Sequence, residues 1–155
     1  ILAELMGFAE GFEPTFPNAG EGQSKTWQRA LRKADCSISD VGAVALSGAG
    51  YKPWDEFELT AASQMGSDVP MWSSRAHIGF AGAAISALDL AAAILSARKA
   101  LVPVTANCQN PIEQAKTINL VRDEALKVSS SLRLVTSYNR AGANAALLVS
   151  GEAVA

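Results

Sequence analysis

The sequence predicts an α/β fold in which a mixed β-sheet is layered with helices. Short apolar runs typical of buried strands alternate with helical segments along most of the chain. The last two β-rich runs are separated only by a short glycine-containing turn, as paired strands are. An alanine-rich segment predicts a helix that can lie close to its neighbours. The 155 residues suit one domain with a core of its own.

The first half of the chain predicts two strands, a loop and two helices. Residues 1–8 form an apolar run typical of a strand, and the Gly, Pro and Asn content of residues 11–22 predicts a loop. In residues 23–34, apolar and small side chains recur every three or four positions, which predicts an amphipathic helix. Residues 41–46, VGAVAL, are typical of a strand buried on both faces. Residues 55–65 should be helical, because their first residues are acidic.

The second half predicts a long helix among strands. Residues 67–74 and 101–107 are expected to be strands, and residues 131–139 and 144–151 are expected to be paired strands. Between them, residues 79–100 predict a helix with alanine on almost every side, which we expect to be buried between other elements. Its alanines are Ala81, Ala83, Ala84, Ala87, Ala91, Ala92 and Ala93.

The composition excludes several classes of partner. Apolar residues make up 49% of the chain and charged residues 18%, with a formal net charge of −2 and no single-sign cluster. Nucleic acid and anionic membranes are therefore not expected as partners. The longest apolar stretch, residues 78–95, contains Asp89 and predicts a buried helix instead of a membrane span. We expect no metal and no cofactor.

The two cysteines bear on the cellular compartment, and the first residues bear on whether the chain is part of a longer protein. Cys36 and Cys108, in a chain without a recognisable signal peptide, favour a reducing compartment, so we expect a cytoplasmic protein. We interpret each cysteine as a small buried apolar side chain. The chain opens on an apolar run at Ile1 with no initiator methionine, which favours a piece of a longer protein.

The glycine-rich stretch after the strand at 41–46 is the first candidate site. Residues 48–50, GAG, resemble the start of a dinucleotide fingerprint, but the third glycine of that pattern would fall at Pro53. Ser47 could be an esterase-type nucleophile, but Ala45 stands where that motif has glycine, and His77 is the sole histidine. Neither interpretation has the sequence context that it requires.

Three segments together resemble the C-terminal half of the β-ketoacyl synthases of the thiolase superfamily. They are LSGAGYKPWDEFE from Leu46, SSRAHIGFAGAAISALDLAAAILSARKALVPVTAN from Ser73, and VTSYNRAGANAALLVS from Val135. The opening ILAELMGFAEGFEP also resembles the strand and loop that begin this half. The resemblance covers almost the whole chain, and it implies that residues 1–155 are one thiolase-like C-terminal domain whose N-terminal half is absent.

The positions that match this family are mostly those of its scaffold. They are Gly48, Asp55 and Glu58 in the first segment, Gly82, Ala83 and Ala84 at the start of the long helix, Pro103, Thr105 and Asn107 after it, and Gly142, Asn144 and Ala145 at the end. So many spaced matches imply the family's fold.

The positions that depart from the family are those of its chemistry. The family's two catalytic histidines fall on Ser47 and Gly79, and its lysine falls on Ser74. In the family, a cysteine thiolate is the nucleophile and two imidazoles stabilise the enolate of the decarboxylated substrate. Loss of one such donor typically lowers the rate by about 10²- to 10³-fold. The resemblance therefore implies no catalytic residue at these three positions, and the nucleophilic cysteine would lie in the absent half.

The family's substrate-binding positions are also changed. The two threonines that bind the pantetheine arm fall on Ala49 and Tyr51, and the gating phenylalanine falls on Arg140. Arg140 could be a solvated charge or could cap the acyl entrance, and the sequence leaves both open. His77, two residues from a catalytic position, is interpreted as an incidental polar residue. Trp54 and Trp72 are interpreted as packing or interface residues.

The resemblance leaves three hypotheses for function. The first is a non-catalytic subunit of fatty acid or polyketide synthesis, similar to a chain length factor, that pairs with an active ketosynthase. The second is a divergent acyltransferase or condensing enzyme that uses Ser47, Ser74, His77 or Arg140 on an acyl thioester. The third lies outside acyl chemistry.

Partners follow from the same resemblance. Half of a thiolase-like subunit would leave a large apolar face uncovered. We expect the chain's own N-terminal half, a ketosynthase-like subunit or a second copy of the chain to cover it in a homo- or heterodimer. Acyl carrier protein is a further candidate partner.

Overall fold

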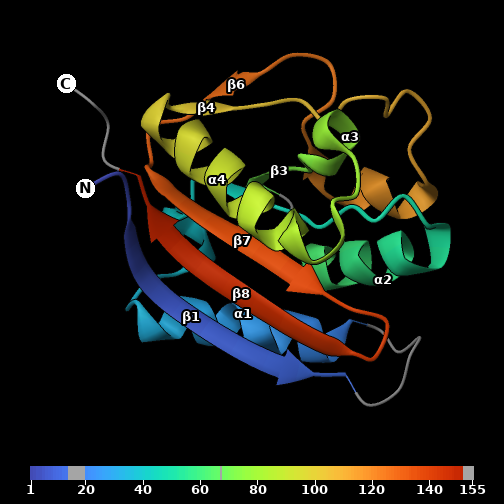
Figure 1. Cartoon of the computed structure of the whole chain (residues 1–155), viewed down its shortest axis with the longest axis horizontal. Coiled ribbons are helices and arrows are strands. Elements are labelled where there is room, and N and C mark those ends of the chain that lie inside the picture. Colours follow the sequence, from blue (N-terminus) through green and yellow to red (C-terminus); the bar gives the residue numbers. More distant parts are fainter. Residues whose placement is uncertain (14–19, 67, 152–155) are drawn as a thin grey trace.

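The computed structural model describes residues 1–13, 20–66 and 68–151, which form a mixed sheet with helices on both faces (Figure 1). The strands are β1 Glu4–Phe12, β2 Ala43–Ala45, β3 Pro70–Trp72, β4 Leu101–Val102, β5 Asn119–Leu120, β6 Leu126–Lys127, β7 Leu132–Tyr138 and β8 Ala143–Ser150. The α-helices are α1 Glu21–Lys33, α2 Lys52–Ser63, α3 Arg75–Ile78 and α4 Ile85–Arg98, and short 3-10 helices span Ile38–Asp40, Gly82–Ala84 and Glu113–Thr117.

The main sheet has the strand order β1-β8-β7-β2-β3-β5. Strands β1, β8 and β7 are antiparallel to one another, whereas β7, β2, β3 and β5 pair in parallel. Strands β4 and β6 form a separate antiparallel pair. The mixed sheet and the paired last strands confirm the predicted architecture.

Helix α1 lies against one face of β1 and β8 (Figure 1) because small residues on β1 allow a close approach. A Cβ atom at Gly7 would collide with the carbonyl oxygen of Ala30, and one at Gly11 would collide with the hydroxyl of Thr26. Glycine at these two positions therefore sets the distance between the helix and the sheet.

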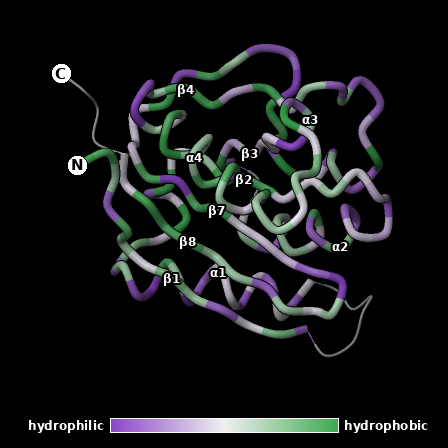
Figure 2. The backbone as a smooth tube through the Cα atoms, viewed as in Figure 1, coloured by the Kyte–Doolittle hydropathy of each residue, from purple (hydrophilic) through white to green (hydrophobic). Residues whose placement is uncertain are grey.

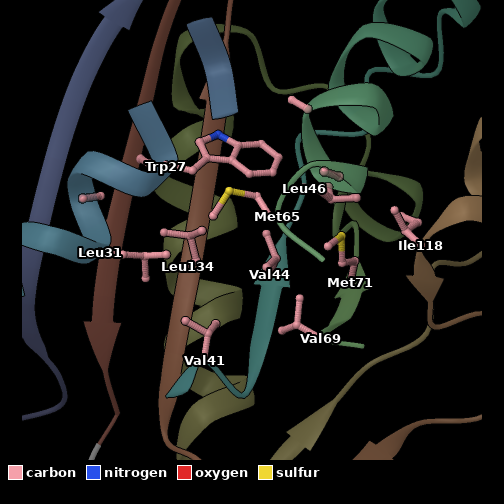
Figure 3. Close-up of a cluster of buried hydrophobic side chains, with 14 of the residues drawn as sticks. Trp27, Leu31, Val41, Val44, Leu46, Met65, Val69, Met71, Ile118 and Leu134 are labelled. Carbon is pink, nitrogen blue, oxygen red and sulfur yellow. The ribbon is translucent and has the colours of Figure 1, made fainter. Parts of the chain in front are cut away.

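Two apolar clusters fill the two sides of the sheet. The larger one packs α1 and α2 against the sheet through side chains that include Trp27, Val44, Met71 and Leu134 (Figure 3). The second lies under α4 and includes Trp72, which is 1% exposed. Figure 2 shows that the chain is hydrophobic along the interior strands of the sheet. The interpretation of Trp72 as a packing residue is confirmed.

Several predicted boundaries differ from the structure for local reasons. The strand predicted at 1–8 is β1, Glu4–Phe12, because its pairing with β8 sets its ends. The helix predicted at 55–65 is α2, which begins at Lys52, because Pro53 suits the first turn of a helix. The predicted strands at 41–46 and 67–74 contain the shorter strands β2 and β3, and residue 67 lies outside the described residues, as do residues 14–19 of the predicted loop.

The helix predicted at 79–100 is shorter, because two glycines break it. Gly79 and Gly82 have φ angles of 75° and 58°, positive values that residues inside a right-handed α-helix do not adopt. Helix α4 therefore begins at Ile85. Of the strand predicted at 101–107, only Leu101–Val102 pairs, and its partner is β6.

The expectation that this helix is buried between other elements is wrong for the described chain. One face of α4 packs on β7 and β8, but Leu88 and Leu95 of the same helix are 41% and 58% exposed. The expectation of buried cysteines is also wrong, because Cys36 and Cys108 are only half-buried. Their positions at a turn and in an irregular segment explain this.

We predict that Gly7→Ala lowers the free energy of unfolding by about 1–3 kcal/mol, because the added methyl group forces α1 away from β1. Denaturant unfolding followed by circular dichroism measures this change. Glu10→Ala, an exposed position on the same strand, is the control and should change stability by less than about 0.5 kcal/mol. Equal effects of the two substitutions would contradict this account of the packing.

Candidate functional site

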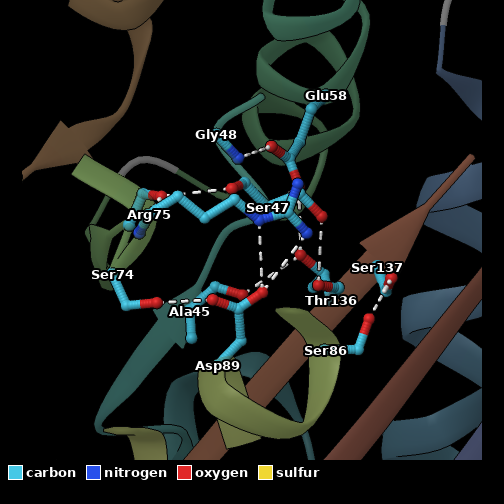
Figure 4. Close-up of polar contacts among 11 residues, drawn as sticks. Ala45, Ser47, Gly48, Glu58, Ser74, Arg75, Ser86, Asp89, Thr136 and Ser137 are labelled. Atoms are coloured by element: carbon cyan, nitrogen blue, oxygen red, sulfur yellow. Dashed lines mark hydrogen bonds and ion pairs between the residues drawn. The ribbon is translucent and has the colours of Figure 1, made fainter. Parts of the chain in front are cut away.

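The candidate site is built around the loop that follows β2. Its first residue, Leu46, donates its N–H to the carbonyl oxygen of Trp72 at 2.8 Å, which extends the parallel pairing with β3 by one residue. Gly48 and Gly50 then have φ angles of 54° and 72°, so the chain turns sharply before α2 begins. The turn places Ser47 and Gly48 directly beside Glu58 of α2 (Figure 4).

Glu58 is the central acceptor of this site. Its two carboxylate oxygens accept the N–H groups of Ser47 and Gly48, each at 2.8 Å. The hydroxyl of Thr136 on β7 lies 3.1 Å from Oε1 of the same carboxylate. Glu58 is 1% exposed, and this burial raises its pKa to about 7 even though the two amides favour the charged form. The carboxylate therefore fixes the loop to α2 and β7.

The hydroxyl of Ser47 is used inside the protein. Ser47 is fully buried, and its Oγ donates to the carbonyl oxygen of Thr136 at 3.2 Å. A serine in this state has no solvent-facing hydroxyl and no histidine to activate it. The esterase interpretation of Ser47 is therefore not supported.

A second buried carboxylate organises the segment that follows β3. Asp89 of α4 is 2% exposed and accepts a short hydrogen bond from the hydroxyl of Ser74 (Figure 4). The guanidinium of Arg75 pairs with the same carboxylate at 3.2 Å. This contact ties the start of α3 to α4, and it engages the Ser74 side chain.

Gly79, where the resemblance predicts the family's second histidine position, offers no side chain. Gly79 lies in an exposed turn between α3 and the 3-10 helix Gly82–Ala84, and no atom lies within 4 Å of the place where its Cβ would be. Nearby, His77 is exposed, and its Nε2 lies 2.8 Å from the carbonyl oxygen of Val104. Both cysteines are free, and the described contacts of His77 involve neither of them.

Ala49, Tyr51 and Arg140, which the sequence predicts as altered substrate-binding positions, lie at or beside an aromatic group at the start of α2. The ring centroids of Tyr51 and Trp54 are 5.2 Å apart, and the rings pack edge to face. The guanidinium of Arg140 lies over the ring of Trp54, 4.8 Å from its centroid. Ala49 and Arg140, with Phe80, line a hollow of about 290 Å³ beside this group. The structure therefore brings Ala49, Tyr51 and Arg140 to one area of the surface.

Two titratable side chains, the carboxyl group of Asp55 and the phenol of Tyr138, border this area. Burial raises the pKa of Asp55, against the effect of the amides of Ala49 and Gly50. Burial and the nearby carboxylates also raise the pKa of Tyr138, which packs edge to face with Trp54. The loop that follows β2 thus has two kinds of neighbour: the carboxylates of α2 and a group of aromatic rings.

The dinucleotide interpretation does not fit this geometry. A phosphate site at a glycine-rich turn needs free backbone N–H groups. Those of Ser47 and Gly48 are already bound to Glu58, and those of Ala49 and Gly50 lie against the carboxylate of Asp55.

Sequence reasoning missed part of the network. Thr136 and Asp89 lie far along the chain from the residues that they contact. Asp89 stands out as an acid in the apolar stretch 78–95, but the local sequence does not show which groups it binds. The i, i+3 spacing of Asp55 and Glu58 was visible, but it did not reveal which of the two would be fully buried.

Among the described residues, no group of three or more His, Cys, Asp and Glu side chains is placed to hold a metal ion. In the same part of the chain, no helix combines the length and apolar character that a membrane crossing requires.

Comparison with known families identifies the class of protein. Residues 3–109 match the family described as "Beta-ketoacyl synthase, C-terminal domain". The match covers more than half of the chain, and the chain belongs to this family.

Individual relatives extend the similarity beyond the matched residues. The chain is 29% identical to the 3-oxoacyl-[acyl-carrier-protein] synthase 2 of Rhizobium meliloti (strain 1021), over 96% of this chain and 37% of that protein. It is 28% identical to the tetracenomycin polyketide synthase ketoacyl synthase beta subunit of Streptomyces glaucescens, over 96% of this chain and 37% of that subunit. The chain thus spans less than two fifths of the length of these relatives.

A solved structure shares the fold. The ishigamide ketosynthase/chain length factor superposes with a TM-score of 0.89 at 22% identity, over 98% of this chain and 38% of that chain. The fold is therefore the thiolase-like fold of the ketosynthases, as the sequence predicts.

We predict that Glu58 makes stability depend on pH. Because burial raises its pKa to about 7 from the model-compound value of 4.5, the folded state retains the proton more strongly than the unfolded state does. The resulting stabilisation is complete below about pH 4.5 and is lost as the pH rises through about 7. Relative to Glu58→Gln, the wild-type chain should therefore become less stable between pH 5 and pH 8.

Denaturant unfolding of both proteins at several pH values measures this difference. Glu56→Gln, on the same helix, is the control and should leave the pH profile of the wild type unchanged. A stability difference between wild type and Glu58→Gln that does not vary with pH would contradict the assignment.

Proposed function

We propose that the chain is the C-terminal half of a ketosynthase-family subunit that does not catalyse condensation and that acts by pairing with an active ketosynthase. The observation that carries this proposal is the state of the vacated catalytic positions. Ser47 is fully buried and bound to a main-chain carbonyl, Ser74 is bound to Asp89, and Gly79 has no side chain. None of them can donate a hydrogen bond to an enolate oxygen.

The degenerate substrate-binding positions support the same proposal. The guanidinium of Arg140 is stacked on Trp54, where a gating phenylalanine would be expected from the family. Ala49 has no hydroxyl for the pantetheine arm, and Tyr51 is packed against Trp54. We propose that these three residues still line the acyl entrance, and that Arg140 narrows it.

An uncovered apolar face supports the pairing. Leu5 and Phe8 of β1 pair with β8 residues that belong to the cluster under α4, yet they are 57% and 49% exposed. Figure 1 shows β1 and β8 uncovered on the side that carries α4. Leu88 and Leu95 of α4 are further large apolar side chains exposed to solvent, and exposed apolar surface of this kind is typical of an interaction site. We propose that the preceding half of the subunit or a ketosynthase-like partner covers it.

Two further assignments complete the proposal. The fatty acid and polyketide synthases among the relatives favour acyl carrier protein as a transient partner. The free thiols of Cys36 and Cys108 suit a reducing compartment, which favours the cytoplasm. A divergent acyltransferase is the second candidate, but the internal bonds of Ser47, Ser74 and His77 speak against it.

We predict that the vacated positions do not contribute to turnover. The chain, alone, should leave a mixture of malonyl- and acyl-loaded carrier protein unchanged in intact-mass analysis. Together with an active ketosynthase, Ser47→Ala and His77→Ala should support the same product formation as wild type, because neither side chain reaches a substrate. A loss of more than about tenfold in either variant would favour the acyltransferase instead.

We also predict that the apolar face mediates association. Analytical ultracentrifugation of the wild-type chain should show self-association when no partner is present, because the exposed leucines of α4 are otherwise in water. The double variant Leu88→Lys and Leu95→Lys should be monomeric. Ile78→Lys, a 48% exposed position on α3, is the matched control and should associate as wild type does. A stable wild-type monomer would contradict this part of the proposal.

A further inference from the structure

A cavity of about 430 Å³ borders the loop that follows β2 and is lined by Gly48 and Gly50 of that loop. It is bounded by α2 on one side and by the irregular segment 105–112 on the other. The hollow beside Arg140 is lined by Ala49, whereas this cavity is lined by Gly48 and Gly50. The cavity is therefore separate from the degenerate substrate-binding positions, and its volume is within the range of small-molecule sites.

The cavity has an apolar floor and a polar mouth. Leu46, Leu59 and Ala115 form the floor and are at most 7% exposed. Exposed residues, Lys52 and Asn107 among them, line the mouth. A compact apolar group that enters the mouth can therefore reach a floor made of aliphatic side chains.

The charged groups on the wall are acidic. Asp55 and Glu58, one helical turn apart on α2, both line the cavity. Asp55 makes no ion pair with any described residue; the backbone amides of Ala49 and Gly50 lie against its carboxylate, and only its buried Oδ1 has no hydrogen-bond partner. The cation at the mouth, Lys52, lies 3.7 Å from Glu56, which does not line the cavity. Among the charged side chains that line the cavity, carboxylates therefore outnumber cations.

We propose that this cavity is a binding site for a small organic amine that carries a compact apolar group. The apolar group fills the space over Leu46 and Leu59, and the ammonium lies against the carboxylate of Asp55. A protonated amine can donate a charge-assisted hydrogen bond to this carboxylate, and such bonds are about twice as strong as neutral ones. A carboxylate or phosphate would instead meet two acids.

A molecule bound in this cavity would contact the loop that follows β2. Gly48 lines the cavity and donates its N–H to Glu58, so a molecule in the cavity contacts the same loop that carries Ser47. The inference does not depend on whether the chain is catalytic, because the cavity is formed entirely by described residues of this chain.

Three probes with the same ring and different heads test the proposal: cyclohexylamine, cyclohexanol and cyclohexanecarboxylate. Amide chemical shifts of the isotope-labelled chain, titrated with each probe at pH 7.5, give the site and the affinity. We expect cyclohexylamine to bind at least about tenfold more tightly than cyclohexanol, as one charge-assisted hydrogen bond provides. Cyclohexanecarboxylate should bind most weakly, and the shifts should lie at the cavity residues.

Two variants and a control locate the determinants. Asp55→Asn should reduce the affinity for cyclohexylamine to that for cyclohexanol, whereas Glu56→Gln, the adjacent acid outside the cavity, should change neither. Ala76→Leu, at an exposed position on the cavity rim, should abolish binding of all three probes without unfolding the chain. The proposal is overturned if no probe binds, if the three bind equally, or if Asp55→Asn leaves the preference for the amine intact.

Discussion

The carboxylate of Glu58 holds two main-chain N–H groups of the loop after β2 and lies against the Thr136 hydroxyl of β7. A fully buried acid is costly unless its oxygens are satisfied, and here each oxygen has a donor at hydrogen-bond distance. The loop, α2 and the centre of the sheet are therefore fixed relative to one another by one side chain. The conformation of every candidate residue in the loop depends on this contact.

This arrangement shows how the loop keeps its shape through internal contacts alone. The acids and glycines that shape the loop are present, and they keep Ser47 in place although its hydroxyl serves only the fold. Ser74 is likewise bound to a carboxylate, Asp89. Beside Ala49 of the loop lie an aromatic group and Arg140, whereas Gly48 and Gly50 border an open cavity. Loss of chemistry and retention of shape are thus compatible.

Much of the fold could be predicted from local pattern, and the errors have identifiable causes. The periodicity of α1 and the paired strands β7 and β8 depend on side chains close in sequence, so the prediction succeeded. The long helix was predicted too long, because the left-handed conformations of Gly79 and Gly82 arise from the turn between α3 and α4. In the site, spacing predicts Ser47, Ser74 and Gly79 as the family's catalytic positions, but it does not predict the partners Thr136 and Asp89, because their contacts cross 78 and 15 positions of the chain.

The sequence by itself determined the layered α/β class, the family resemblance and the absence of imidazole at the two expected positions, since these follow from residue identity and spacing. Only the tertiary structure decided which acid is buried, which hydroxyls are engaged and that a cavity lies behind the loop. The physical reason is that burial and hydrogen bonding are set by groups from distant segments meeting in space. The same reason explains why one face of α4 is left uncovered in this chain.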